Sequence, residues 1–381
     1  MAFDVIAPTK DLIRALSLAS SVVEKRSTLP ILGHFKLEAK EGSVIITATD
    51  SDLELMQEVS AHVKDSGVLT VSATTFGEII RKIPDQEVSL QFLNGESRLN
   101  VHSKNCSFNI STLSADDFPI MEDIGSSYNI TLSVSALCML LDHTKYAMST
   151  EETRYNLTGI YLHSDTNNPR ALIAAATDCH RLAVSSVDID RDLQQFGIIL
   201  PAKMVHEMVK ITKDPSAVGR DIEMHIGQNK IKFVFGGITI TSKIIDGAFP
   251  EYHAFIPTDN DYKLVIQAKE LADAIDRVAT ITVEKFRAVK MICTSTTVEI
   301  QASGVAKGEA HEVIVAGGVD GTTSYSGPEI AIGFNPRYIL DVLTSVADSM
   351  VTLELKDTSS PVLIKAANFP SANFVVMPVN V

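Results

Sequence analysis

Several features are scarce or absent in the 381 residues: tryptophan does not occur, aromatic residues make up 6%, and there are four cysteines. The cysteines lie far apart, with no Cys-x-x-Cys pair and no histidine at zinc-ligand spacing, which excludes a metal knuckle and a thiol redox pair. No apolar run approaches the roughly 18 residues that cross a bilayer, and the N-terminal residues lack a signal-peptide pattern. We therefore expect a cytosolic protein with no metal, no cofactor and no membrane contact. Buried reduced thiols are expected at Cys106, Cys138, Cys179 and Cys293.

Positive charge is also scarce, because 33 Lys and Arg stand against 47 Asp and Glu, giving a net charge of −14. Phosphate binding requires Lys and Arg, so the total argues against a general nucleic-acid surface. Hydrophobic residues reach 45% of the chain, which indicates a globular protein with several cores. At about 100 to 200 residues per domain, the length predicts two to four domains.

The chain contains one pattern that recurs three times at a domain-sized period. Each copy opens with a short strand and an amphipathic helix, as in "VIAPTKDLIRALSLASSVV", "ITLSVSALCMLLDHTKYAM" and "LVIQAKELADAIDRVATIT". Alternating strands follow, and then a second strand and helix: "LTVSATTFGEIIRKI", "IILPAKMVHEMVKI" and "IAIGFNPRYILDVLTSV". The pattern predicts three domains, at residues 1–127, 128–260 and 261–381, each with two helices and about eight strands.

Two helices cannot cover both faces of so many strands, so each domain is predicted to be α+β, with antiparallel sheets and both helices on one face. Together the six predicted helices carry 13 Lys and Arg against 10 Asp and Glu. They are therefore the positive part of an acidic chain, although a solvated face explains any single helix equally well. Their predicted ranges are 8–26, 74–83, 133–149, 202–213, 268–280 and 335–349.

The stretch "ATDCHRLAV", from Ala176 to Val184, places an Asp, a Cys, a His and an Arg at consecutive positions. An earlier stretch, "ATDSDLEL", shares its first three letters but none of the reactive residues. Adjacent side chains on a strand point to opposite faces, so Cys179 and His180 cannot act as a nucleophile and its base if the strand continues. If the chain turns there, that geometry stays open. A hydrolase, ordinary turn residues and a binding role are the three alternatives.

Six motifs, taken in order, resemble the family of bacterial sliding clamps, the beta subunits of DNA polymerase III. They are "TLPILGHFKLEA", "ATDCHRLAV", "SKIIDGAFPEY", "EKFRAV", "IGFNPRYILDVL" and the ending "FVVMPV", and the resemblance covers the whole chain. It implies a non-catalytic processivity factor: a head-to-tail homodimer whose six domains form a ring around double-stranded DNA of any sequence. Its implied partners are a clamp loader complex, the replicative polymerase alpha subunit and other polymerases that carry a clamp-binding peptide. A peptide-binding adaptor that does not bind DNA is the main rival.

The resemblance also implies a peptide-binding cleft between the second and third domains. Three positions depart from the family: Cys179 stands where glycine is common, Ala254 where some relatives carry arginine, and Val379 where methionine is frequent. A core position would explain Phe286 as well as a cleft position does. The implied cleft residues are Leu157, Thr177, Cys179, His180, Arg181, Leu182, Pro250, Phe255, Phe286, Asn335, Tyr338, Met377, Pro378 and Val379.

For DNA, the resemblance and the charge pattern favour Arg26, followed by Lys10, Arg14, Lys203, Lys210, Arg337 and Tyr155, although surface solubility would explain each cation. For closure of the ring, it implies that Phe108 and Ile110 face Thr280 and Ile281 across the dimer seam. A core strand would explain Phe108 and Ile110 equally well. Arg98 and Lys104 are expected to lie toward Glu309 and Glu312.

Overall fold

The computed structural model describes residues 3–24, 28–92, 97–125, 128–214, 217–282, 288–304, 308–317 and 323–380. The chain forms two compact units: unit 1 contains Met1–Leu137 and His206–Ile244, and unit 2 contains Cys138–Val205 and Ile245–Val381. The described residues form four sheets whose neighbouring strands run antiparallel, and the fold is α+β as predicted. No helix within the described ranges is long and apolar enough to cross a membrane.

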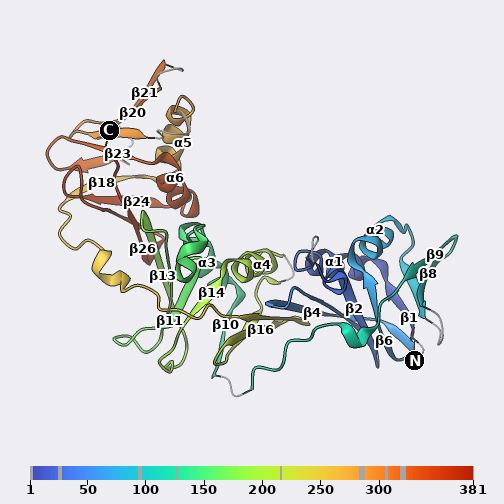
Figure 1. Ribbon diagram of the computed structural model, residues 1–381. Helices are drawn as coiled ribbons and strands as arrows, with labels where there is room; N and C mark the ends of the chain where they lie inside the picture. Colours follow the sequence, from blue (N-terminus) through green and yellow to red (C-terminus); the bar gives the residue numbers. More distant parts are fainter. Residues whose placement is uncertain are drawn as a thin grey trace. The chain divides into compact units, whose positions relative to one another are not determined.

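Unit 1 holds two sheets, with α1 (Thr9–Ala19) and α2 (Ala73–Lys82) lying side by side (Figure 1) and α1 packed on β3 and β4. The five-stranded sheet has the order β5 (His62–Asp65), β1 (Phe3–Pro8), β7 (Glu87–Phe92), β8 (Arg98–Ser103) and β9 (Cys106–Ser111). The eight-stranded sheet has the order β10 (Tyr128–Ser133), β15 (Asp221–Ile226), β16 (Lys230–Phe235), β17 (Ile238–Lys243), β4 (Leu53–Ser60), β3 (Ser43–Thr49), β2 (His34–Lys40) and β6 (Gly67–Ser72).

Unit 2 also holds two sheets, and α5 (Ala268–Ala279) packs beside α6 (Pro336–Ser345) (Figure 1). The nine-stranded sheet has the order β14 (Gly197–Pro201), β11 (Gly159–Ser164), β12 (Ala171–Thr177), β13 (Arg181–Asp188), β26 (Phe369–Val376), β25 (Val362–Ala366), β24 (Met350–Leu355), β18 (Tyr262–Gln267) and β22 (Ser324–Ser326). The four-stranded sheet has the order β21 (Gly308–Val315), β20 (Thr297–Gly304), β19 (Val289–Cys293) and β23 (Ile330–Phe334).

Two further α-helices and five short 3₁₀ helices complete the elements of the described ranges. The α-helices are α3 (Val134–Thr144) and α4 (Ala202–Thr212). The 3₁₀ helices are η1 (Pro30–Gly33), η2 (Ala115–Asp117), η3 (Lys145–Ala147), η4 (Glu152–Leu157) and η6 (Tyr252–Phe255).

The threefold repeat is visible in the backbone hydrogen bonding. In each repeat the strand before the first helix pairs with the strand after the second helix: β1 with β7, β10 with β15, and β18 with β24. One equivalent hydrogen bond also recurs, in which the N–H of the first helical residue donates to a carbonyl just before the later strand. These bonds join Thr9 to Gln86 at 2.8 Å, Val134 to Arg220 at 2.9 Å and Ala268 to Ser349 at 3.0 Å. The domain boundaries at residues 127 and 260 remain a prediction.

All six predicted α-helices are present, but some are shorter than expected. The helix α1 ends at Ala19, where the hydroxyls of Ser20 and Ser21 donate to the carbonyls of Leu16 and Leu18. With the observed bounds, the six α-helices carry nine Lys or Arg and eight Asp or Glu. The positive excess that we predicted for the helices is therefore almost absent among the described residues, since residues 145 and 213 lie beyond the α-helix ends and residues 25 and 26 lie outside the described residues.

The cysteines correct another expectation. All four are free thiols, yet only Cys293 is buried, whereas Cys106 and Cys179 are exposed and Cys138 is half-buried. Cys106 begins the edge strand β9, and Cys179 lies in a tight turn between β12 and β13. Within the described residues, no group of three or more His, Cys, Asp or Glu side chains could hold a metal ion.

Candidate functional site

The two copies of Ala-Thr-Asp form the same turn, one between β3 and β4 and the other between β12 and β13. Asp178 Oδ1 accepts the backbone N–H groups of His180 and Arg181 at 2.9 and 3.0 Å. Asp50 Oδ1 does the same for residues 52 and 53, at 2.9 and 2.7 Å. The residue after each Asp, Cys179 or Ser51, has a left-handed backbone with φ of 73° or 78°. In both copies the Asp therefore serves as the side-chain acceptor of a turn.

This turn also decides whether Cys179 and His180 form a catalytic pair. The thiol of Cys179 accepts a hydrogen bond from Arg154 Nη1 at 3.1 Å. The imidazole of His180 stacks on the ring of Tyr338, with centroids 5.8 Å apart and planes 15° from parallel. Asp178 is occupied by backbone N–H groups and by Arg181, so it does not orient His180. This stretch therefore contains no pairing of a nucleophile with a general base.

Arg181 is buried, with 6% of its surface exposed, and each nitrogen of its guanidinium donates a hydrogen bond. Its Nε donates to Asp178 at 3.1 Å, its Nη1 to Asp341 of α6 at 2.5 Å, and its Nη2 to the carbonyl of Tyr146. The same group lies over the ring of Tyr338, 4.7 Å from its centroid. Burial raises the pKa of Tyr338; Asp178 adds to this effect and Arg181 opposes it. Arg181 thus ties the turn to α6.

A groove of about 490 Å³ lies beside this turn in unit 2. Leu182, Val375 and Pro250 form apolar parts of its lining, and Phe255 and Met377 stand at its surface with exposed fractions of 63% and 38%. The lining also contains polar residues, among which Lys356 pairs with Asp259 at 2.5 Å. Large apolar side chains gathered at a concave surface are typical of a binding site for an apolar ligand or peptide.

Seven of the predicted cleft residues line this groove: Thr177, Cys179, Arg181, Leu182, Pro250, Phe255 and Met377. Ala254, singled out as a departure from the family, lines it too. The remaining lining residues were not predicted, and most of them come from two segments, 252–260 and 356–361. Asn260 joins these segments by donating to the carbonyls of Glu354 and Pro361, both at 2.9 Å. The unpredicted residues are Tyr252, Pro257, Asp259, Asn260, Lys356, Ser360, Pro361 and Val375.

Other predicted cleft residues lie outside the groove lining. Leu157 is buried at the end of η4, and Asn335 caps α6 by accepting the backbone N–H of Arg337 at 3.0 Å. His180 and Tyr338 stack on each other, as described above. Phe286 lies outside the described residues.

The C-terminal segment is docked by its backbone. The N–H of Met377 donates to the carbonyl of His180, and the N–H of Val379 donates to the carbonyl of Gly333, each at 2.9 Å. Pro378 lies between these two anchors. Met377 is thereby held in the wall of the groove.

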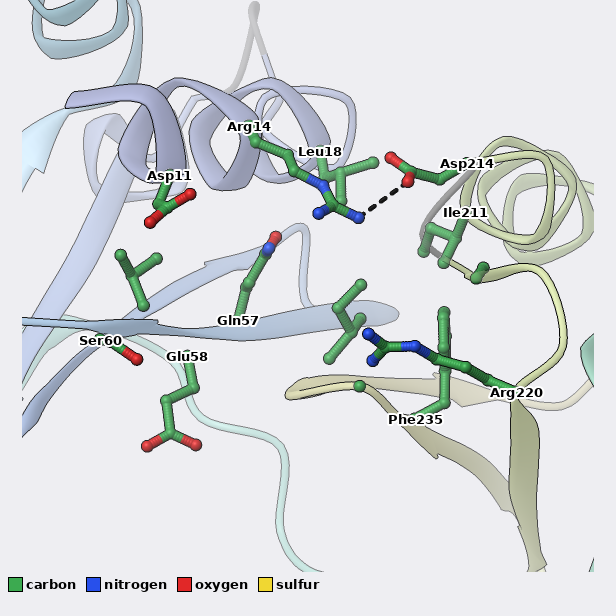
Figure 2. A pocket seen from close by; sticks show the side chains of 14 residues that line it. Asp11, Arg14, Leu18, Gln57, Glu58, Ser60, Ile211, Asp214, Arg220 and Phe235 are labelled. Atoms are coloured by element: carbon green, nitrogen blue, oxygen red, sulfur yellow. Dashed lines mark hydrogen bonds and ion pairs between the residues drawn. The ribbon is translucent and has the colours of Figure 1, made fainter. Parts of the chain in front are cut away.

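Most of the predicted DNA contacts are exposed side chains, but Arg26 lies outside the described residues. Two of the cations form ion pairs: Arg14 Nη2 with Asp214 at 2.8 Å (Figure 2), and Lys210 with Glu207 at 2.7 Å. Arg14 also lines a pocket of about 180 Å³ in unit 1, together with Arg220 and Gln57 (Figure 2). The pair of Arg14 with Asp214 lies at the surface and is therefore weak, whereas Glu207, the partner of Lys210, is buried. Lys10, Lys203, Arg337 and Tyr155 are exposed as well.

The residues predicted for the dimer seam lie at or near sheet edges. Strand β9, which contains Phe108 and Ile110, is an edge strand of the five-stranded sheet, and β21 is an edge strand of the four-stranded sheet. Within the described sheets, β9 and β21 are therefore each paired on one side only. Ile110 is only 6% exposed and packs into its own unit, whereas Phe108 is half-buried. Thr280 is exposed and Ile281 is half-buried. Glu312 is already paired with Arg277, whose Nε donates to it at 2.9 Å.

Three family models cover most of the chain. They are those of the N-terminal, central and C-terminal domains of the DNA polymerase III beta subunit, and they match residues 1–122, 131–251 and 253–380. The beta sliding clamp of Rickettsia felis is 45% identical over 380 residues, covering 99% of both chains. That of Escherichia coli K12 is 34% identical over 369 residues, covering 96% of this chain and 97% of its own.

Solved structures are similar over the full length as well. A crystal structure of the Caulobacter crescentus beta sliding clamp, with PEG bound, has a TM-score of 0.91 at 35% identity. The DnaN sliding clamp of Bartonella birtlesii, bound to griselimycin, has a TM-score of 0.93 at 33% identity. Both comparisons cover 100% of each chain.

Proposed function

Because the chain belongs to the family of bacterial DNA polymerase III beta subunits, the beta sliding clamps, we propose that it works as a ring that tethers polymerases to DNA through the groove of unit 2. It is a non-catalytic subunit of DNA polymerase III and a processivity factor in replication. The proposal concerns the parts that carry out this role: the partner groove, the dimer seam and the contact with DNA.

The groove beside Cys179 is proposed to bind a short linear peptide with apolar anchor residues. One observation carries this assignment: Phe255 and Met377 are exposed at a concave, mainly apolar site whose wall is completed by the docked C-terminal segment. Rigid walls limit the ordering cost of binding on the side of the protein. The proposed ligands are the clamp-binding peptides of the replicative polymerase alpha subunit, of other polymerases and of the clamp loader complex.

The ring is proposed to close when β9 of one protomer meets β21 of the other, twice in a symmetric homodimer. Unpaired strand edges can add strands from another chain, and a head-to-tail contact between two different edges closes if the rotation allows it. Double-stranded DNA of any sequence would pass through the ring. Contacts from side chains such as Lys10 and Arg337 would then attract phosphates weakly, without fixing a register.

Peptide binding tests the groove directly. We expect Phe255→Ala and Met377→Ala each to weaken binding of a Gln-containing peptide that ends in Leu and Phe by about 2 kcal/mol, as loss of a hot-spot anchor does. Fluorescence anisotropy with the full-length protein measures the affinity. Val218→Ala is the matched control, because Val218 is also an exposed apolar residue but lies outside the groove. Unchanged affinity in both groove variants would reject the assignment.

A further inference from the structure

A second groove, which we call the aromatic groove, adjoins the first one in unit 2. It has a volume of about 750 Å³, and its rings are those of Tyr161, His163, Phe196, Phe249, Tyr252 and His253. Tyr161 stacks on Phe249 with centroids 5.0 Å apart and planes 8° from parallel. Tyr161 also stacks on His163 at 4.6 Å, and Tyr252 stacks on His253 at 4.1 Å. His163 and Tyr252 are buried, so the accessible aromatic surface of the groove comes from the half-buried rings of Tyr161, Phe196 and Phe249 and the exposed ring of His253.

The imidazole of His163 is neutral in this arrangement. Its Nδ1 lies 2.9 Å from the carbonyl of Ser164, so that nitrogen must donate, and its Nε2 then accepts from the hydroxyl of Tyr252 at 2.9 Å. Burial lowers the pKa of His163, which agrees with this tautomer. His163 thus contributes a ring to the groove and no positive charge.

The charge of the aromatic groove is negative. Its lining contains the carboxylates of Asp165 and Glu251 and, within the described residues, neither Lys nor Arg. Glu251 is exposed and accepts from His253 Nδ1 at 2.8 Å. After burial, the charge of Glu251 is a further cause of the raised pKa of Tyr161. Aromatic faces beside carboxylates form an environment that attracts a guanidinium or an ammonium group.

The two grooves share two lining residues, Pro250 and Tyr252. Tyr252 is almost fully buried, so it forms a fixed wall between them. Gly197 leaves room for the side chain of Tyr161, because a Cβ at position 197 would lie 2.3 Å from the hydroxyl of Tyr161. A peptide that leaves the first groove past Pro250 would therefore enter the aromatic groove.

We propose that the aromatic groove binds a Lys or Arg side chain in the segment that flanks the apolar anchors of the partner peptide. This inference rests on the proposed function, since it requires a peptide in the first groove. It adds a chemical requirement on the partner: a basic residue next to the apolar ones. The groove supplies stacking for a guanidinium and two carboxylates for its charge.

Peptides with one altered side chain test this inference on the full-length protein. Three peptides share the same apolar core: one has no flank, one has a flank with Arg, and one has citrulline in place of that Arg. Each flanked peptide is made in two versions, one with the flank before the apolar core and one with the flank after it. For one placement we expect the Arg peptide to bind about five-fold more tightly than the citrulline peptide. Fluorescence anisotropy at fixed salt concentration measures the ratio.

Neutralising the groove separates a local effect from the general attraction of a chain with net charge −14. In a variant with Glu251→Gln and Asp165→Asn the ratio is expected to fall below about two-fold, whereas the unflanked peptide binds as before. The control variant, Glu329→Gln with Asp190→Asn, removes two exposed carboxylates outside both grooves and should keep the five-fold ratio.

The outcomes distinguish this inference from the proposed function. Equal binding of the Arg and citrulline peptides at both placements, or an equal loss of preference in the two variants, would overturn the inference and leave the first groove assigned. Failure of the unflanked peptide to bind would overturn the proposed function and this inference with it.

Discussion

At the scale of single residues, Cys179 shows what the sequence could and could not predict. Alternation along a strand excluded a Cys-His pair only if the strand continued, and the chain turns at Asp178. The pair is excluded instead by the contacts seen in the structure, because Cys179 is hydrogen-bonded to Arg154 and His180 stacks on Tyr338. The repeated Ala-Thr-Asp was the signal for a shared turn, and it lies in both hairpins. Glycine usually marks a left-handed residue, so cysteine and serine at these positions hide the turn.

Replacing Cys179 by glycine tests the strain in that turn. A residue with a Cβ at φ of 73° is held in the left-handed region, which disfavours side chains other than glycine. We expect Cys179→Gly to be more stable than Cys179→Ala by about 1 kcal/mol, since both lack the thiol and only alanine retains the Cβ. Urea unfolding with equal m values measures the difference. Equal midpoints would show that the turn stores no such strain.

Some polar lining residues of the groove were beyond what the sequence could predict. Asp259 and Lys356 are far apart in sequence, and nothing near either residue indicates that they will pair. Their meeting depends on the pairing of β18 with β24 and on the hydrogen bonds of Asn260. Such contacts follow from tertiary structure, whereas the apolar wall could be inferred from the family resemblance.

At the scale of elements, periodicity predicted which segments are helices and strands but not where they end or which strands become neighbours. The pairs β4–β17 and β13–β26 extend sheets from one predicted repeat to the next. Alternation of apolar residues indicates which face of a strand is buried, but it does not indicate which strand will pair with its edge. This is why three repeats were predicted and the continuous sheets were not.

The packing of α3 gives a prediction about pH. His143 of α3 lies under β13 and β26, with its Nδ1 3.0 Å from Ser185 Oγ and its ring 4.5 Å from that of Phe369. Burial lowers the pKa of His143 from 6.5 to about 4. The unfolded chain therefore binds this proton first, and stability is lost as the pH falls from about 6.5 toward 4.

For this one group the loss between pH 7 and pH 5 is about 2 kcal/mol. The variant His143→Gln can still hydrogen-bond to Ser185 but does not titrate. Between pH 7 and pH 5 we expect its free energy of unfolding to fall by about 2 kcal/mol less than that of the unmodified protein. Urea unfolding of both proteins at the two pH values gives the comparison. An identical pH dependence would mean that His143 is not the group that titrates.

The edge strands give a second prediction at this scale. Ile110 is buried within its own unit, so the exposed charges near β9 and β21 test the seam with less risk to the fold. We expect Arg98→Glu with Lys104→Glu to weaken a dimer of about twice 41.3 kDa by about 2 kcal/mol, because like charges would then approach Glu309. Sedimentation equilibrium measures the dissociation constant.

A charge exchange serves as the control for the seam. Adding Glu309→Lys to that variant should recover much of the lost affinity, and Lys82→Glu, a charge reversal on α2, should leave it unchanged. A dimer that is insensitive to Arg98→Glu with Lys104→Glu would place the seam elsewhere.

At the scale of the whole molecule, the charge of the chain favours retention on DNA by encirclement and not by a tight surface complex. The chain carries −14, and its α-helices hold nine cations against eight carboxylates, which is too little positive charge for a tight surface complex with DNA. A closed ring needs no strong contact, because DNA cannot leave it sideways. Weak attraction to phosphates also permits sliding.

We therefore expect retention on DNA to depend on the shape of the DNA. Once a clamp loader has placed the protein on nicked circular DNA, it should stay bound through gel filtration and leave when the circle is cut. A protein held by ion pairs would survive the cut at low salt and would leave both forms of DNA as salt rises, with a slope set by the phosphates it contacts. Lys10→Ala, which removes an exposed cation of α1, should slow loading and barely change release from circles. Equal retention on circular and linear DNA after loading would reject the closed ring, because only a ring makes the ends of the DNA matter.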